Sequence, residues 1–131
     1  MEKLSLPSME HNFHILSKGN ETGRHYEGEF TYHRPNLHQK AEITKMATRL
    51  DGDLKNLPLE VHIFNEMCAV LSLCVVKAPE WWYDSNSGRD LYDMNVLEEV
   101  YKECMVFEQE WIKKVWGNKN ESDKPKKNRK K

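Results

Sequence analysis

The segment from Leu59 to Ala78 reads LEVHIFNEMCAVLSLCVVKA and is the stretch around which we expect the fold to form. Pro58 precedes it and Pro79 follows it; proline is tolerated in the first turn of a helix but not in its interior. Asn56 stands where it can cap the start. A helix that is apolar on nearly every side belongs inside a structure, so we expect a core helix over 57–78. The alternative hypothesis is that another polypeptide, rather than the chain's own domain, covers part of the surface of this helix.

This segment is unsuited to cross a membrane, because polar residues interrupt its first two turns and fewer than about 18 apolar residues are continuous. The start of the chain, MEKLSLPSMEHNFH, lacks the apolar run of a signal peptide. The sequence therefore predicts a protein of the cytoplasm, with no membrane association. Cys68, Cys74 and Cys104 fall on apolar helix faces and are expected to be reduced and buried.

Charge is distributed unevenly along the 131 residues. Residues 117–131 contain seven Lys or Arg against two acidic residues, a net charge of +5, whereas residues 1–116 carry −6. Such an acidic body does not favour binding to a phosphate backbone, so nucleic acid is an unlikely partner. We expect a flexible N-terminus over 1–10, one domain over 11–116, and a disordered basic tail over 117–131.

The first half of the domain shows strand periodicity. Residues 24–33 alternate aromatic with polar side chains, and a short apolar patch at 12–16 precedes them across a turn rich in Gly and Asn. This pattern predicts a β-hairpin, with Gly28 marking a bulge or a close approach of the backbone.

Helix signals follow. Asn36 and Gln39 form a capping box, the helix extends to about Leu50, and Gly52 ends it. A last helix, capped by Asp93 or Asn95, is apolar at three- and four-residue spacing as far as Trp116. The fold class is thus mainly α with a small N-terminal hairpin (α+β) and about three main helices.

Catalytic and metal-binding patterns are missing from the sequence. His11 and His14 have no third ligand nearby, and no nucleotide-binding or hydrolase motif occurs. We therefore expect a protein that is not an enzyme, with no metal and no cofactor. Among the acidic residues of the last helix only Glu108 lies on the apolar side, where it would pair with Arg49, Arg34 or a partner's cation.

Aromatic and methionine residues exceed what three helices need to enclose a core, and both types are enriched at interaction surfaces. An aromatic-rich core is the alternative explanation. As protein-binding candidates we select Trp81, Trp82, Tyr83, Met105, Trp111 and Trp116.

Several segments in order resemble the tail-assembly chaperones of long-tailed bacteriophages and prophages, over roughly residues 26–116. They are GEFTYHRPNL (28–37), AEI (41–43), LDG (50–52), APEW (78–81) and LYD (91–93). The resemblance implies a small, mainly helical protein that self-associates and binds the tape-measure protein before the tail tube forms. It also implies an extended form, made by ribosomal frameshifting, that reaches the tail-tube protein; the lysine codons at 126–127 and 130–131 would be the slippery run.

Two other functions stay open at this level. One is a structural head–tail or tail-completion protein that remains in the virion. The other is a small nucleic-acid-binding regulator that uses the basic tail.

Overall fold

The computed structural model describes residues 6–52 and 56–128, with side chains as far as residue 117. Its elements are β1 (Glu10–Lys18), β2 (His25–His33), α1 (Leu37–Asp51), α2 (Leu59–Cys74), β3 (Val75–Lys77), α3 (Glu80–Asp84) and α4 (Met94–Asn128). This confirms the α+β class, with three long helices and a short one in the described part. The expectations for residues 1–5 and 129–131 lie outside it.

The β-hairpin is confirmed as an antiparallel pair that places Phe13 opposite Phe30 and His14 opposite Glu29. Because side chains alternate across a strand, one face of the sheet is apolar and buried, while the other carries polar groups such as His14. The added Cβ of an alanine at residue 28 would lie 2.4 Å from Pro79 Cγ, so Gly28 does mark a close approach.

The expected core helix is shorter than 57–78, because α2 ends at Cys74 and the chain enters a third strand. Val75 pairs with Tyr32 and Lys77 with Thr31, giving the sheet order β1-β2-β3. Val75 and Val76 are β-branched and suit a strand, and β2 offers them unpaired backbone groups. Tertiary pairing thus overrides the helical pattern in the last turn.

The caps are partly as expected. Asn36 and Gln39 form the capping box of α1, and the Gly52 amide donates to the Thr48 carbonyl at the other end. Asn56 does not cap α2: Pro58 occupies the N-cap position and no side chain bonds there. That expectation was wrong, because α2 begins later than the apolar pattern suggested.

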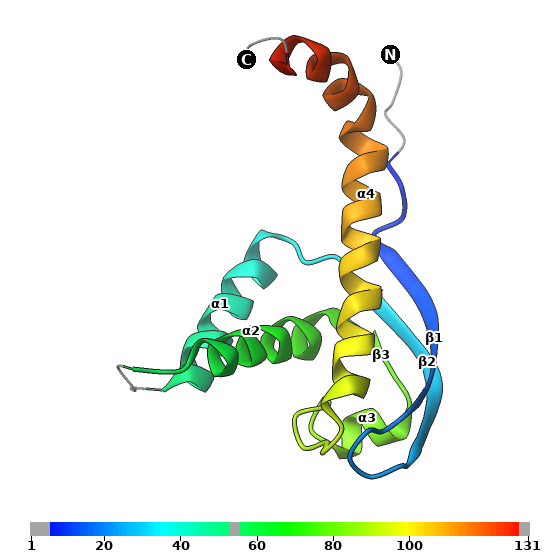
Figure 1. Cartoon of the computed structure of the whole chain (residues 1–131), viewed down its shortest axis with the longest axis vertical. Helices are drawn as coiled ribbons and strands as arrows, with labels where there is room; N and C mark the ends of the chain where they lie inside the picture. The colour runs from blue at the N-terminus through cyan, green and yellow to red at the C-terminus, as the bar shows by residue number, and fades with distance from the viewer. Residues whose placement is uncertain (1–5, 53–55, 129–131) are drawn as a thin grey trace.

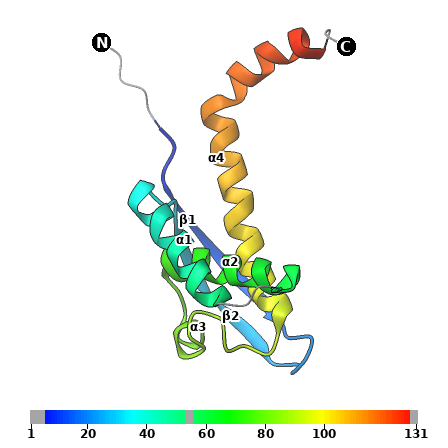
Figure 2. The same cartoon turned by 90° about the vertical axis from the view of Figure 1, so that its left-hand side faces the viewer.

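Helix α4 is the central element (Figure 1). The sheet lies on one side of its first half, and the α1–α2 hairpin projects from the other side, as Figure 2 also shows. Between them lies a core built from every element except α1, including Phe30, Leu71, Trp82 and Val100. The helix then extends beyond the sheet, and its backbone continues to Asn128, past the expected start of the tail at Gly117.

Asp93 and Asn95 do not cap α4 as expected, because in the described residues both side chains bond the β1–β2 turn and its flanks instead. The buried Asp93 carboxylate accepts bonds from the Thr22 hydroxyl (2.6 Å), the Tyr26 hydroxyl (2.9 Å) and the amides of Glu21 and Thr22 (2.7 and 2.9 Å). Burial raises the pKa of Asp93, but these donors outweigh it and lower the pKa to about 2. Asn95 adds bonds to the backbone of Asn20 and Lys18.

Farther along α4, Glu108 pairs with Arg34, one of the partners that the sequence left open. Arg34 Nε donates to Glu108 Oε1 at 2.8 Å, and the Tyr32 hydroxyl donates to Oε2 at 2.6 Å. Burial beside this carboxylate raises the pKa of Tyr32. The bonds join the end of β2 to α4.

The expected burial of the three cysteines is confirmed, and all three are free thiols. Burial raises the pKa of Cys68 and of Cys74 to about 11. Among the helices that the structure describes, none has the length and apolar character that a bilayer crossing requires.

Candidate functional site: an apolar groove beside the long helix

The six residues selected from the sequence fall into two groups at different places. Trp81, Trp82 and Tyr83 form the short helix α3, which lies beside the first turns of α4 (Figure 1). Trp82 is fully buried, Trp81 is partly buried, and Tyr83 is 53% exposed. Three consecutive aromatic residues cannot all face the core, and Tyr83 is the one that faces solvent.

The other three candidates belong to α4. Trp111 is buried under Arg34 and donates from Nε1 to the Pro7 carbonyl at 3.3 Å, so it serves the chain's own packing. Met105 is partly buried against the core, and Trp116 is 48% exposed. In this structure Trp82 and Trp111 offer little surface to a partner, whereas Trp116 does.

Trp116 belongs to a row of apolar side chains along one side of α4. Tyr101, Met105, Ile112 and Trp116 follow each other at spacings of four, seven and four residues, which are close to whole turns at about 3.6 residues per turn. We call these four residues the α4 strip. Tyr101 and Met105 pack beside the core, while Ile112 is 44% exposed and continues the strip beyond the sheet.

Tyr101, at the N-terminal end of the α4 strip, lines a groove between α4 and the α1–α2 hairpin. This groove has a volume of about 400 Å³. Apolar side chains from all three helices line it, namely Ile43, Ala47, Val70 and Tyr101. Tyr101 belongs to both features, so we consider the groove and the α4 strip together and call them the groove–strip surface.

Polar residues close one side of the groove and hold the hairpin together. Asp51 accepts from Asn65 Nδ2 at 2.9 Å and bonds His62 Nδ1 at 2.8 Å, and His62 Nε2 lies 3.3 Å from Glu66. The Asn65 bond, with the bond to His62, lowers the pKa of Asp51, and the bond to Asp51 raises that of His62. These contacts tie the end of α1 to the first turns of α2.

The chemistry of this surface suits binding rather than a reaction. It offers aliphatic and aromatic side chains, and its titratable groups Asp51, His62 and Glu66 already bond one another. In the described part of the chain, no three His, Cys, Asp or Glu residues are grouped to hold a metal ion. The lack of an enzymatic activity, a metal and a cofactor stays a prediction.

Sequence reasoning missed Ile112 and the contribution of α1. A signal existed for Ile112, since its helical phase matches that of Met105 and Trp116. No comparable signal existed for Ile43 and Ala47, because the angle between the hairpin and α4 is not encoded in a local pattern. Comparison with protein-family models, curated proteins and solved structures returned no match for this chain.

Proposed function

We propose that this protein is a non-enzymatic tail-assembly chaperone of a long-tailed bacteriophage or prophage. It binds apolar, helical segments of the tape-measure protein in the host cytoplasm before the tail tube forms. The observation that carries the proposal is the groove–strip surface, an apolar surface beyond the core. The ordered segments between residues 28 and 93 that resemble this family support the assignment of the partner.

The shape of the surface favours a helical partner. Tyr101 and Trp116 are about 22 Å apart along α4, at about 1.5 Å per residue, which matches roughly four turns of a bound helix. A helix that lies in a groove presents apolar residues at spacings of three and four to it. The partly open groove would receive one end of such a segment, and Ile112 and Trp116 would cover the rest.

The composition of the surface suits a partner with many different apolar segments. Met105 is flexible and adapts to varied contacts, and tryptophan is enriched among residues that dominate binding energy. A long unassembled chain exposes such segments and would aggregate without a cover. We expect truncation of Trp116 to cost about 2 kcal/mol of binding free energy, or about 30-fold in affinity.

The experiment is co-expression with the tape-measure protein. Ile112→Glu and Trp116→Glu should each lower the soluble fraction of the tape-measure protein severalfold. Lys114→Glu is the matched control, since Lys114 is exposed on the other side of the same helix. Equal solubility with all three variants, each folded by circular dichroism, would contradict the proposal.

The proposal extends to self-association and to the tail-tube protein, reached through a frameshifted extended form. The nucleotide sequence at residues 126–131 tests the latter, and a run without a slippery heptamer excludes it. Mass spectrometry of purified virions tests the chaperone role itself. A chaperone is absent from the particle, whereas a head–tail or tail-completion protein is present.

A further inference from the structure

A second pocket, of about 250 Å³, lies at the α3 end of the molecule. It is formed by the start of β2, α3 and the segment that leads to α4, and it shares no residue with the groove. Aromatic rings and carboxylates line it together: Tyr26, Trp81 and Tyr92 with Asp84 and Asp90, and Arg24 at the edge.

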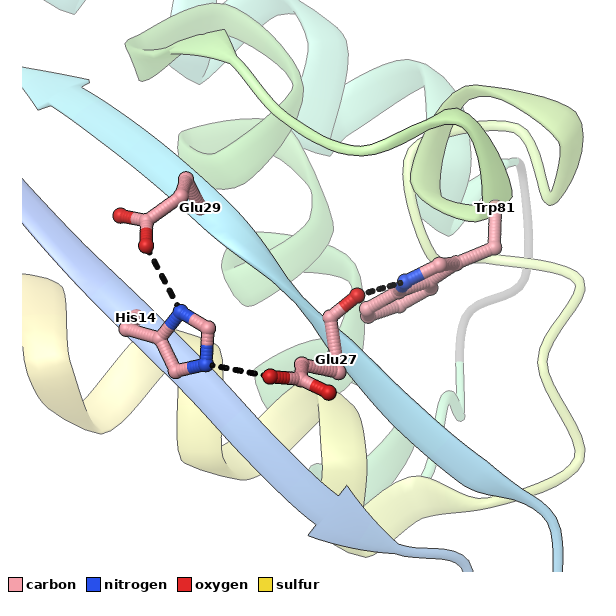
Figure 3. A network of polar contacts seen from close by, with 4 residues as sticks. All are labelled: His14, Glu27, Glu29 and Trp81. Carbon is pink, nitrogen blue, oxygen red and sulfur yellow. Dashed lines mark hydrogen bonds and ion pairs between the residues drawn. The ribbon is translucent and has the colours of Figure 1, made fainter.

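Two of the aromatic rings are held in place by hydrogen bonds. Trp81 Nε1 donates to the Glu27 carbonyl at 3.0 Å (Figure 3), and the Tyr26 hydroxyl donates to the buried Asp93. Their ring centroids are 4.9 Å apart in an edge-to-face arrangement. Figure 3 also shows His14 between the carboxylates of Glu27 and Glu29, which steadies the strands behind Trp81. The aromatic wall is therefore preorganised.

The two carboxylates of the pocket have no such partners. Within the residues that the structure describes, neither the Asp84 nor the Asp90 side chain makes a hydrogen bond or an ion pair. The guanidinium carbon of Arg24 lies 5.7 Å from the centroid of the Tyr26 ring, and among the described residues Arg24 forms no ion pair with either aspartate. The Arg24 guanidinium thus lies over the Tyr26 ring at the edge of the pocket, while the carboxylates of Asp84 and Asp90 remain unpaired.

We propose that this pocket binds an arginine side chain of a partner polypeptide. A planar guanidinium stacks on Trp or Tyr faces through cation–π attraction and donates two parallel hydrogen bonds to a carboxylate. Trp81, which is partly buried and lines the pocket, supplies the first interaction, and Asp84 and Asp90 supply the second. This site shares no residue with the groove–strip surface, so the test of arginine binding is independent of the test of the proposed function.

The test uses the full chain labelled with ¹⁵N and follows the indole N–H signal of Trp81, assigned with the Trp81→Phe variant. The probes are N-acetyl-arginine amide and its uncharged analogue N-acetyl-citrulline amide. The arginine probe should shift the Trp81 signal and saturate at low-millimolar concentration, as befits a single side chain. The citrulline probe should produce no saturable shift.

Variants of the pocket residues test which groups bind the arginine probe. The double variant Asp84→Asn, Asp90→Asn should weaken arginine binding about tenfold or more, because the charge-assisted bonds are lost. Both residues are exposed, so the fold should be retained, which the remaining spectrum checks. Arg24→Ala should bind the probe at least as tightly as the natural chain. Equal shifts with citrulline, unchanged affinity in the double variant, or binding only after Arg24→Ala would each overturn the proposal.

Discussion

The guanidinium carbon of Arg34 lies 3.8 Å from the centroid of the Trp111 ring. From this position Arg34 Nε also donates a hydrogen bond to Glu108, which accepts a second one from the Tyr32 hydroxyl. Both charged side chains are more than four-fifths buried. A charge that loses its partner in such a place is costly, since water reaches it poorly and replaces the lost bonds only in part.

Glu108→Ala should therefore lower the free energy of unfolding by about 3 kcal/mol, because Arg34 and the Tyr32 hydroxyl lose their acceptor. Urea denaturation measures this. Glu110→Ala is the control, since Glu110 is exposed on the same helix and its removal should change stability by less than about 0.5 kcal/mol. Similar values for the two variants would contradict the role assigned to Glu108.

Asp93 should make the fold sensitive to strong acid. Its pKa is lowered from 3.8 to about 2, so its stabilising effect is complete above pH 4 and is lost as the pH falls toward 2. Asp93→Asn should remove this part of the acid dependence, measured as the urea midpoint between pH 2 and 6. The control Asp90→Asn should keep it. A natural chain whose midpoint stays constant over this range would refute the prediction.

His62 should give the fold a pH dependence of the opposite sign to that of Asp93. Its bond to Asp51 raises its pKa above 6.5, so the stability it adds is complete below pH 6.5 and is lost as the pH rises through the raised value. Urea midpoints between pH 5.5 and 8.5 should fall for the natural chain and change less for His62→Gln. His38→Gln, at an exposed position of α1, serves as the control. Parallel curves for the natural chain and His62→Gln would argue against this role.

The close approach of Gly28 to Pro79 can be tested by adding one methyl group. In Gly28→Ala the new Cβ would meet two ring carbons of Pro79 at 2.4 and 2.6 Å, so strand or ring must shift. We expect a loss of about 1–3 kcal/mol in thermal or urea denaturation. Gly117→Ala, whose new Cβ would meet no described atom within 4 Å apart from the neighbouring helix backbone, should instead be neutral or stabilise α4 by up to about 1 kcal/mol.

The buried thiols should be inert in the folded protein. Desolvation raises the pKa of Cys68 and Cys74 to about 11, so few thiolates exist at pH 8. A thiol-specific chromogenic disulfide should label no cysteine of the native chain within minutes, and all three in concentrated urea. Rapid labelling of the native protein would show that the core opens easily.

The sequence by itself determined what depends on neighbours along the chain. The alternation over residues 24–33 was enough to predict β2, and the capping pair Asn36 and Gln39 was enough to predict the start of α1. The spacing of apolar residues identified the buried side of α4. Glu108 stood out because a carboxylate on that side needs a buried partner.

Only the tertiary structure decided which elements meet. The edge of β2 converts the end of the apolar segment into β3, and the β1–β2 turn takes over the side chains of Asp93 and Asn95. The angle between the α1–α2 hairpin and α4 opens the groove, whereas β2 and Arg34 cover Trp82 and Trp111 and leave Trp116 exposed. The physical reason is that a periodic pattern specifies which face is apolar, whereas the choice of what covers that face depends on contacts between residues far apart in the chain.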